Sequence, residues 1–339
     1  MIETMKELCL LNGVSGKEDA VREAIIAKLQ GKCEYHVDNL GNIIVFKKGK
    51  KTPKNKVLLT AHMDEVGFIV THIEDNGFIR FSECGSIDPR VVVSRTVTVG
   101  KNNVFGVIGT KAMHMKSNEE SEKTYEFKDL YIDIGAKDGK EAAEYVKLGE
   151  RATFKSEWVE YGDNLVRCKA LDDRAGCAIL LNLIENFDEY DMNYAFTVQE
   201  ETGCVGAKCA ANAVMPDIAL VVETTTAGDI PGASAEKISS YLGKGPVVYF
   251  KDRRTLYNTE IYSLIMEKAE EWNIPHQSKT SITGTNEAMV MQLTGGGVKV
   301  AAIATPCRYL HSASCTLNKE DAENTYKLIN NVLSVLAEY

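Results

Sequence analysis

The sequence lacks the cysteine patterns that mark disulfide frameworks and thiolate zinc sites. Its 339 residues include nine cysteines, an odd number, and no two of them form a Cys-x-x-Cys pair. The closest pairs, Cys204 with Cys209 and Cys307 with Cys315, have spacings that are poor for zinc. These absences exclude a small secreted scaffold held together by disulfides and indicate reduced thiols, most of them buried.

Long apolar runs and an excess of positive charge are also missing. No apolar segment approaches the roughly 20 residues needed to cross a bilayer. The N-terminus, Met1-Ile-Glu-Thr-Met-Lys6, lacks the charge-then-apolar order of a signal peptide. The formal net charge of −9 argues against a general nucleic-acid or anionic-membrane binder. We therefore expect a cytoplasmic protein that has no membrane or nucleic-acid partner.

The chain does contain an alternation of predicted strands and helices, which is interrupted once. This alternation, at both ends of the chain, predicts an α/β fold with a mixed central sheet and helices on both faces. Between these parts, short alternating strands separated by Gly, Asn and Asp turns predict a small β-barrel or sandwich. Its expected strands are 68–70, 78–81, 91–99, 104–108 and 151–154. The larger domain would comprise residues 1–67 and 164–339, and the insertion residues 68–163.

Acidic and histidine side chains recur where buried strands are predicted to end. They are His62 and Asp64 after strand 56–61, Glu200 and Glu201 after strand 194–198, Glu223 after strand 218–222, and His311 after strand 298–304. Asp172 and Asp173 join an extended segment to a helix. Buried acids are costly unless something uses their charge, and open α/β sheets bind ligands at this edge. Nitrogen and oxygen ligands without thiolates suit zinc, cobalt or manganese, so we expect a shared metal centre.

The residue types suggest different roles within such a centre. A metal-bound histidine usually donates its other N–H to a carboxylate, so Asp64 is the expected partner of His62. Asp172 could bridge two cations because a carboxylate has two oxygens, although it or the next aspartate could instead cap the following helix. If one of Glu200 and Glu201 binds metal, the other can hold a proton near the attacking water.

Four motifs that contain these residues occur in a fixed order. They are His62-Met-Asp-Glu-Val-Gly67, Ala170-Leu-Asp-Asp-Arg174, Gln199-Glu-Glu201 and Tyr309-Leu-His-Ser312. Together they resemble the motifs of the tetrahedral (TET-type) aminopeptidases, which include the glutamyl and deblocking aminopeptidases and relatives labelled endoglucanase. Weaker matches, such as Gly13-Val-Ser-Gly-Lys-Glu18 and Asp38-Asn-Leu-Gly-Asn42, extend the resemblance almost from end to end.

The resemblance implies a metal-dependent aminopeptidase that removes N-terminal residues from peptides. It assigns one divalent cation to His62, Asp172 and Glu223, and a second to Asp172, Glu201 and His311, so that Asp172 bridges them. Zinc or cobalt would be the metals, and manganese would also suit. Glu200 would be the catalytic base, and Asp64 would orient His62. The implied fold is a zinc-peptidase-like domain whose inserted small β-barrel builds a homo-oligomer, often a tetrahedral dodecamer.

Three positions depart from the family pattern and keep other hypotheses open. Glu223 stands where the family usually has Asp, Gly284-Thr-Asn-Glu287 where it usually reads Gly-Thr-Asp-Ala, and His311-Ser-Ala-Ser-Cys315 lacks the usual proline and glutamate. One alternative is therefore an amidohydrolase that acts on N-blocked amino acids or peptides. Another, which the endoglucanase label of some relatives implies, is a glycoside hydrolase with paired carboxylates. A further one is an inactive assembly scaffold, against which the intact ligand residues argue.

Overall fold

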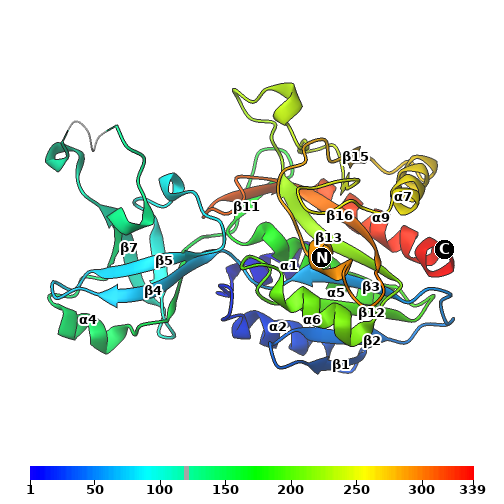
Figure 1. Ribbon diagram of the computed structural model, residues 1–339, viewed down its shortest axis with the longest axis horizontal. Helices are drawn as coiled ribbons and strands as arrows, with labels where there is room; N and C mark the ends of the chain where they lie inside the picture. Colours follow the sequence, from blue (N-terminus) through cyan, green and yellow to red (C-terminus); the bar gives the residue numbers. More distant parts are fainter. Residues whose placement is uncertain (118–121) are drawn as a thin grey trace.

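A computed structural model describes residues 1–117 and 122–339 and shows two units side by side (Figure 1). The larger unit contains a sheet of strands β1 (Glu34–Val37), β2 (Ile43–Lys47), β3 (Val57–His62), β10 (Val159–Tyr161), β11 (Leu165–Cys168), β12 (Met192–Thr197), β13 (Ile218–Thr226), β14 (Val247–Val248), β15 (Gln277–Ser278), β16 (Lys299–Arg308) and β17 (Cys315–Asn318). The smaller unit contains β4 (Gly67–Ile73), β5 (Ile79–Cys84), β6 (Thr96–Val99), β7 (Val104–Thr110), β8 (Leu130–Asp133) and β9 (Arg151–Phe154).

The helices belong mostly to the larger unit. They are α1 (Ile2–Leu10), α2 (Asp19–Leu29), α5 (Leu171–Asn186), α6 (Val205–Val214), α7 (Thr259–Glu271), α8 (Ala288–Met291) and α9 (Lys319–Glu338), while α4 (Gly139–Tyr145) lies on the smaller unit. Among the described residues, no helix combines the length and apolarity that crossing a bilayer requires.

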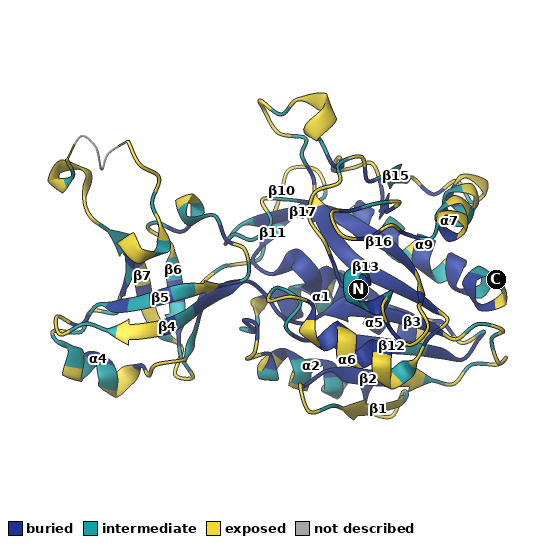
Figure 2. Cartoon of the chain, viewed as in Figure 1, coloured by how far each residue is buried: buried dark blue, intermediate teal, exposed yellow. Residues whose placement is uncertain are grey.

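The large sheet is mixed, with the order β1-β2-β12-β3-β13-β16-β17-β11-β10. Strands β12, β3, β13 and β16 run parallel to one another at its centre, and antiparallel strands flank them. The central strands are dark blue in Figure 2, which marks them as buried. Parallel strands that are covered on both faces read as near-continuous apolar runs, and Val57–Ala61 and Ile218–Val222 have this composition.

Helices cover the sheet on both faces because the strand side chains alternate between two apolar layers. Ile218, Leu220 and Val222 of β13 pack in the core layer that α5, α7 and α9 cover. The intervening Ala219 and Val221 face the opposite layer, where α6 and α8 pack. The predicted fold class is thus confirmed for the larger unit.

The smaller unit is a closed barrel with the order β4-β5-β8-β7-β6-β9. Its interior is filled by alternate residues of these strands, including Phe68, Val97, Ile132 and Phe154. The sequence pattern is compatible with either a barrel or a sandwich. Because the strands pair continuously from β4 round to β9, which pairs with β4 again, the unit is the barrel that the family resemblance implies. Strand β10 falls within the predicted insertion, residues 68–163, yet it pairs with β11 in the large sheet.

Several predicted strands differ from those observed; the strand predicted at 298–304, for example, continues to Arg308. Two other differences have a clear physical reason. The predicted strand 91–99 is wrong in its first half, because Pro89 begins a short 3-10 helix (Pro89–Val91) and Ser94 has a positive φ of 63°. The strand predicted to end before Glu223 instead continues to Thr226, since the β-branched Thr224–Thr226 still pair with Thr305–Cys307 of β16. Glu223 therefore projects from within β13 and not from the loop after it.

Candidate metal centre

The sequence-predicted site residues come together at one edge of the large sheet. Because β3, β12, β13 and β16 are parallel, their carboxyl ends open on the same side of the molecule. His62 ends β3, Glu200 and Glu201 follow β12, and Glu223 lies near the end of β13. His311 follows β16, and Asp172 lies at the start of α5.

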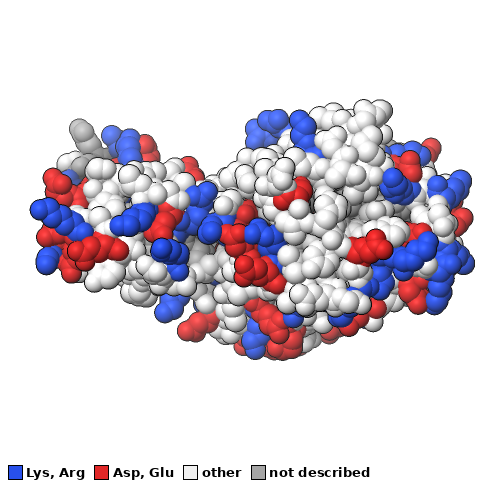
Figure 3. Space-filling model, turned by 90° about the horizontal axis from the view of Figure 1, so that it is seen from below, with Lys and Arg blue, Asp and Glu red and all other residues white. Residues whose placement is uncertain are grey.

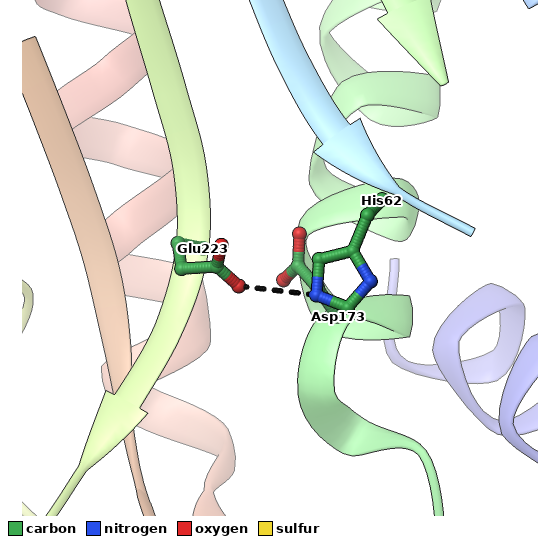
Figure 4. A group of neighbouring side chains, drawn as sticks. All are labelled: His62, Asp173 and Glu223. Atoms are coloured by element: carbon green, nitrogen blue, oxygen red, sulfur yellow. Dashed lines mark ion pairs between the residues drawn. The ribbon is translucent and has the colours of Figure 1, made fainter. Parts of the chain in front are cut away.

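His62 forms the first group of converging side chains. Its Nε2 atom lies 3.3 Å from Asp172 Oδ1 and 3.5 Å from Glu223 Oε1. Figure 4 shows Glu223 reaching from β13 toward the imidazole, with Asp173 beside them. One ligand atom from each of His62, Asp173 and Glu223 lies within 4.8 Å of the other two.

His311 forms the second group on the other side of Asp172. Its Nε2 atom lies 3.4 Å from Asp172 Oδ2 and 3.5 Å from Glu201 Oε2. Asp172 thus presents one oxygen to each histidine, as a bridging ligand would. Asp173 instead accepts the Gly176 N–H through Oδ1 at 3.0 Å and so caps α5. The two adjacent aspartates therefore make different contacts.

The spacing of these atoms fits bound cations better than direct hydrogen bonds. Distances of 3.3–3.5 Å exceed those of a good N–H···O hydrogen bond. Two ligands of a tetrahedral zinc ion, each bound at about 2.0–2.1 Å, are about 3.3 Å apart. Asp172 Oδ1 is buried and has no hydrogen-bond partner among the residues that the structure describes. The donor atoms present therefore suit two divalent cations that share Asp172.

The site also concentrates negative charge in a desolvated place. Desolvation raises the pKa of Glu201 to about 7 and that of Glu223 to about 8, and in both cases repulsion from Asp172 adds to it. Burial lowers the pKa of His311, but the attraction of Glu201 and Asp172 outweighs it and raises the pKa to about 10. Cations held between these groups would relieve the repulsion between the carboxylates.

Asp64 connects the first histidine to the two glutamates. His62 Nδ1 lies 3.4 Å from Asp64 Oδ1 and 3.2 Å from its backbone oxygen. The backbone N–H groups of Glu200 and Glu201 donate to the Asp64 carboxylate at 2.9 and 3.2 Å. The Ser15 hydroxyl donates to the same carboxylate at 2.6 Å. This fully buried side chain thus lies against His62 and also accepts hydrogen bonds from the start of the loop after β12.

Glu200 also lines this cavity. Among the described residues, its carboxylate forms no ion pair with His62 or His311. Desolvation raises the pKa of its carboxyl group well above the usual range, and repulsion from Glu201 and Glu223 adds to this. The Cys204 thiol lies 3.2 Å from Glu200 Oε1 and donates to it. A carboxyl group with a raised pKa in this position is suited to taking up and releasing a proton.

The site opens into a cavity of about 460 Å³. Besides the residues already described, its walls include Ser86, Thr224, Thr225, Thr226, Ser239, Tyr249, Lys279, Thr283, Thr285 and Leu310. Ser86 comes from the loop after barrel strand β5, and its backbone oxygen lies 2.7 Å from His311 Nδ1. The sequence reasoning missed Ser15, Ser86 and Lys279 because they lie in loops that carry no metal-ligand or strand-end pattern.

The family of the chain follows from comparison with known proteins. The sequence model of the M42 glutamyl aminopeptidase family matches residues 41–328. The chain belongs to the M42 family of aminopeptidases. It is 38% identical over 335 residues to a protein of Acetivibrio thermocellus that is provisionally named as an aminopeptidase, with 97% of each chain covered. It is 30% identical over 344 residues to the lysyl aminopeptidase of Pyrococcus furiosus, with 98% of this chain and 97% of that protein covered.

A solved structure supports the same assignment. The Pyrococcus horikoshii TET1 peptidase, which can assemble into a tetrahedron or a large octahedral shell, matches with a TM-score of 0.86 at 34% identity. The match covers 99% of each chain. The resemblance to TET-type aminopeptidases that the motifs predicted is confirmed, and so is the fold class.

The positions where this M42 chain departs from the usual family pattern lie around the site. Glu223 reaches His62 from within β13, so the longer side chain keeps its oxygen in the first group. Asn286 and Glu287 are buried behind the cavity wall, where Asn286 accepts a hydrogen bond from Tyr257 and Glu287 one from the Thr197 hydroxyl. Cys315 is a buried free thiol.

Proposed function

We propose that this M42 chain is a metal-dependent aminopeptidase that removes N-terminal residues from peptides. The observation that carries the proposal is the position of Asp172, whose two oxygens face His62 and His311 from opposite sides. His62, Asp172 and Glu223 would hold one divalent cation. Asp172, Glu201 and His311 would hold the other. Zinc or cobalt is the metal that these nitrogen and oxygen donors favour, and manganese would also suit.

The side chains of this chain suit the proton transfers that peptide hydrolysis needs. When bound, the two cations supply a Lewis acid that polarises the scissile carbonyl and lowers the pKa of the attacking water. Glu200 takes the proton from that water and passes it to the departing amine. Burial raises the pKa of this carboxyl group, which makes the carboxylate a stronger base toward the proton of the water. Asp64 holds the Glu200 backbone and the His62 ring in place.

The alternatives are less well supported. A glycoside hydrolase would need two carboxyl groups free to act on a sugar, whereas here Asp172, Glu201 and Glu223 face histidines. An inactive scaffold has no need of a carboxylate between two imidazoles. The hypothesis that the substrate is an N-blocked amide depends on the unusual residues Glu223 and Asn286. Glu223 keeps contact with His62 and Asn286 is bound to Tyr257, so neither favours a blocked substrate over a free one.

We further propose that the chain forms a homo-oligomer in the cytoplasm, with a tetrahedral dodecamer as the expected assembly. The similarity to a TET peptidase supports this, as do apolar side chains exposed on the barrel unit, including Phe105, Met113 and Met115. On the face drawn in Figure 3, Lys and Arg are interspersed with Asp and Glu. This mixture, with the net charge of −9, agrees with the expectation that nucleic acid is not a partner.

The test is a measurement of metal content together with hydrolysis of a panel of aminoacyl-p-nitroanilides and their N-acetylated forms, before and after chelation. We expect about two metals per chain, activity only on free-amino substrates, loss of activity on chelation and recovery with zinc or cobalt. Activity restricted to N-acetylated substrates would replace the proposal with the blocked-amide hypothesis. Full activity without metal would refute the proposed centre.

A further inference from the structure

A cluster of buried cysteines lies beside the proposed metal centre and has no role in the proposed proton transfers. Four of the eleven buried residues in one core cluster of the larger unit are cysteines, and all four are free thiols. They are Cys9 of α1, Cys168 of β11, Cys307 of β16 and Cys315 of β17. A buried cysteine often does no more than fill space as a small apolar residue, so a further role has to follow from how these thiols contact one another.

The four thiols form two pairs. The side chains of Cys307 and Cys315 are hydrogen-bonded to each other, and so are those of Cys9 and Cys168. Cys307 lies opposite Leu317 on the neighbouring antiparallel strand, so Cys315, two residues earlier, points to the same face. Burial raises the pKa of the Cys307 thiol, whereas the contact with Cys307 lowers the pKa of the Cys315 thiol. Two thiols in contact, one of which loses its proton more readily, form a disulfide when an oxidant reaches them.

Cys307 and Cys315 bracket the loop that carries His311. A bond between the two sulfur atoms would close a ring around residues 308–314. The Cys315 thiol donates to the backbone oxygen of Ser312, the residue after His311, at 3.5 Å. A disulfide sulfur has no proton to donate, so oxidation removes this hydrogen bond. His311 has a positive φ of 57°, which non-glycine residues rarely adopt, so its position depends on the contacts that hold the loop.

A small oxidant has a route to this pair from the metal centre. Cys315 lines a small recess together with Asp172, Glu201 and His311. Its side chain is buried, with an exposed fraction of 2%. The recess therefore suits an oxidant of the size of hydrogen peroxide and excludes a bulky disulfide.

We propose that Cys307 and Cys315 are a peroxide-sensitive dithiol whose oxidation to a disulfide weakens the binding of the metal ion that His311 would hold. The Cys315 thiolate attacks one oxygen of hydrogen peroxide, the O–O bond breaks, and the other oxygen leaves as water after taking up a proton. Cys315 is then a sulfenic acid. The Cys307 thiol attacks its sulfur, so that the S–S bond forms, the S–O bond breaks and a second water leaves. This inference rests on the metal centre of the proposed function and not on its substrate.

The test treats the full-length protein, reduced and loaded with zinc, with hydrogen peroxide. Disulfides are mapped by mass spectrometry of its peptides, and zinc affinity is measured by competition with a chelator. We expect a disulfide between Cys307 and Cys315 and an affinity lower by at least about tenfold at one of the two metal sites, both reversed by dithiothreitol. Cys307→Ala should keep its zinc affinity after the same treatment. Cys9→Ala is the matched control, since Cys9 is as buried as Cys307 but belongs to the other pair, and it should respond like the wild type.

Several outcomes would overturn the inference. A wild-type protein without the Cys307–Cys315 disulfide after treatment would do so, and so would a bond from Cys315 to Cys168, which lies directly opposite on β11. Neither result depends on how a variant folds. A disulfide that leaves zinc affinity unchanged, or an equal loss of affinity in Cys307→Ala, would refute the link to His311. If the reduced protein binds no zinc, the proposed metal centre fails and the inference with it. A chain that binds zinc but hydrolyses no peptide refutes only the aminopeptidase proposal, because no substrate enters this test.

Discussion

Replacing Asp64 by asparagine tests whether one buried carboxylate organises the whole centre. The Asp64 carboxylate accepts hydrogen bonds from the backbone N–H groups of Glu200 and Glu201 and from the Ser15 hydroxyl, and it lies 3.4 Å from His62 Nδ1. Asparagine has nearly the same shape, but one oxygen becomes an NH₂ group. That group would face donors, so the change leaves at least one buried N–H without an acceptor and removes the negative charge.

The size of the effect follows from these contacts. A buried polar group left unpaired costs about 1–3 kcal/mol, and hydrogen bonds to a charged acceptor are worth about 1.5–3 kcal/mol each. We therefore expect Asp64→Asn to lower the free energy of unfolding by about 2–4 kcal/mol. With an unfolding entropy of about 2 cal/mol/K per residue, a chain of 339 residues would lose about 3–6 °C in Tm. Metal affinity should also fall about 10–100-fold, as for other carboxylates that orient a metal-binding histidine.

The assay pairs thermal unfolding of the metal-free protein with metal titration by calorimetry. Asp321→Asn is the matched control, because Asp321 is 1% exposed, accepts the backbone N–H groups of Gly243 and Gly245 at 2.6 and 2.7 Å, and does not line the cavity. This control should lose similar stability and keep wild-type metal affinity. The reasoning would be refuted if Asp64→Asn bound metal like the wild type, or if both variants lost affinity equally.

Three further results are expected. Glu200→Gln should retain both metals and lower kcat by about 10²–10⁴-fold in a steady-state assay, and near-normal turnover would contradict its role as the base. Metal affinity measured by calorimetry should fall as the pH is lowered from about 8 to 6, by about tenfold per pH unit for each proton that the metal displaces. The reason is that protons then occupy Glu201 and Glu223, whose raised pKa values are about 7 and about 8. An affinity independent of pH would argue against carboxylate ligation. Lys169→Met should lower the free energy of unfolding by about 3–5 kcal/mol in denaturant titrations, since it removes the ammonium that lies 2.6 and 2.8 Å from the oxygens of the buried Glu65. Among the described residues, the carboxylate then keeps only the Gly13 N–H and the more distant Arg174 guanidinium, 3.7 Å away. Adding Glu65→Gln, which keeps an oxygen for the Gly13 N–H but removes the unneutralised charge, should recover part of that loss, and no recovery would show that the cost lies in packing.

The sequence by itself determined the fold class and the candidate ligands, because both depend on local patterns. Buried strands have a distinct composition, and an acid or a histidine that follows one within a few residues stands out against it, as with His62, Glu201 and His311. The alternation of strands and helices then predicts a sheet whose parallel strands end at one edge, so side chains at those ends must meet. The change to short, evenly spaced strands likewise marked the insertion.

Only the tertiary structure decided how those residues face one another and what surrounds them. Asp172 and Asp173 make different contacts because their side chains point in different directions at the start of α5. The sequence of two adjacent aspartates does not reveal those directions. The continuation of β13 beyond Glu223 depends on pairing with β16, about 80 residues away in the chain. Ser86 and Lys279 reach the cavity from loops after β5 and β15, whose course is set by long-range packing and not by local composition.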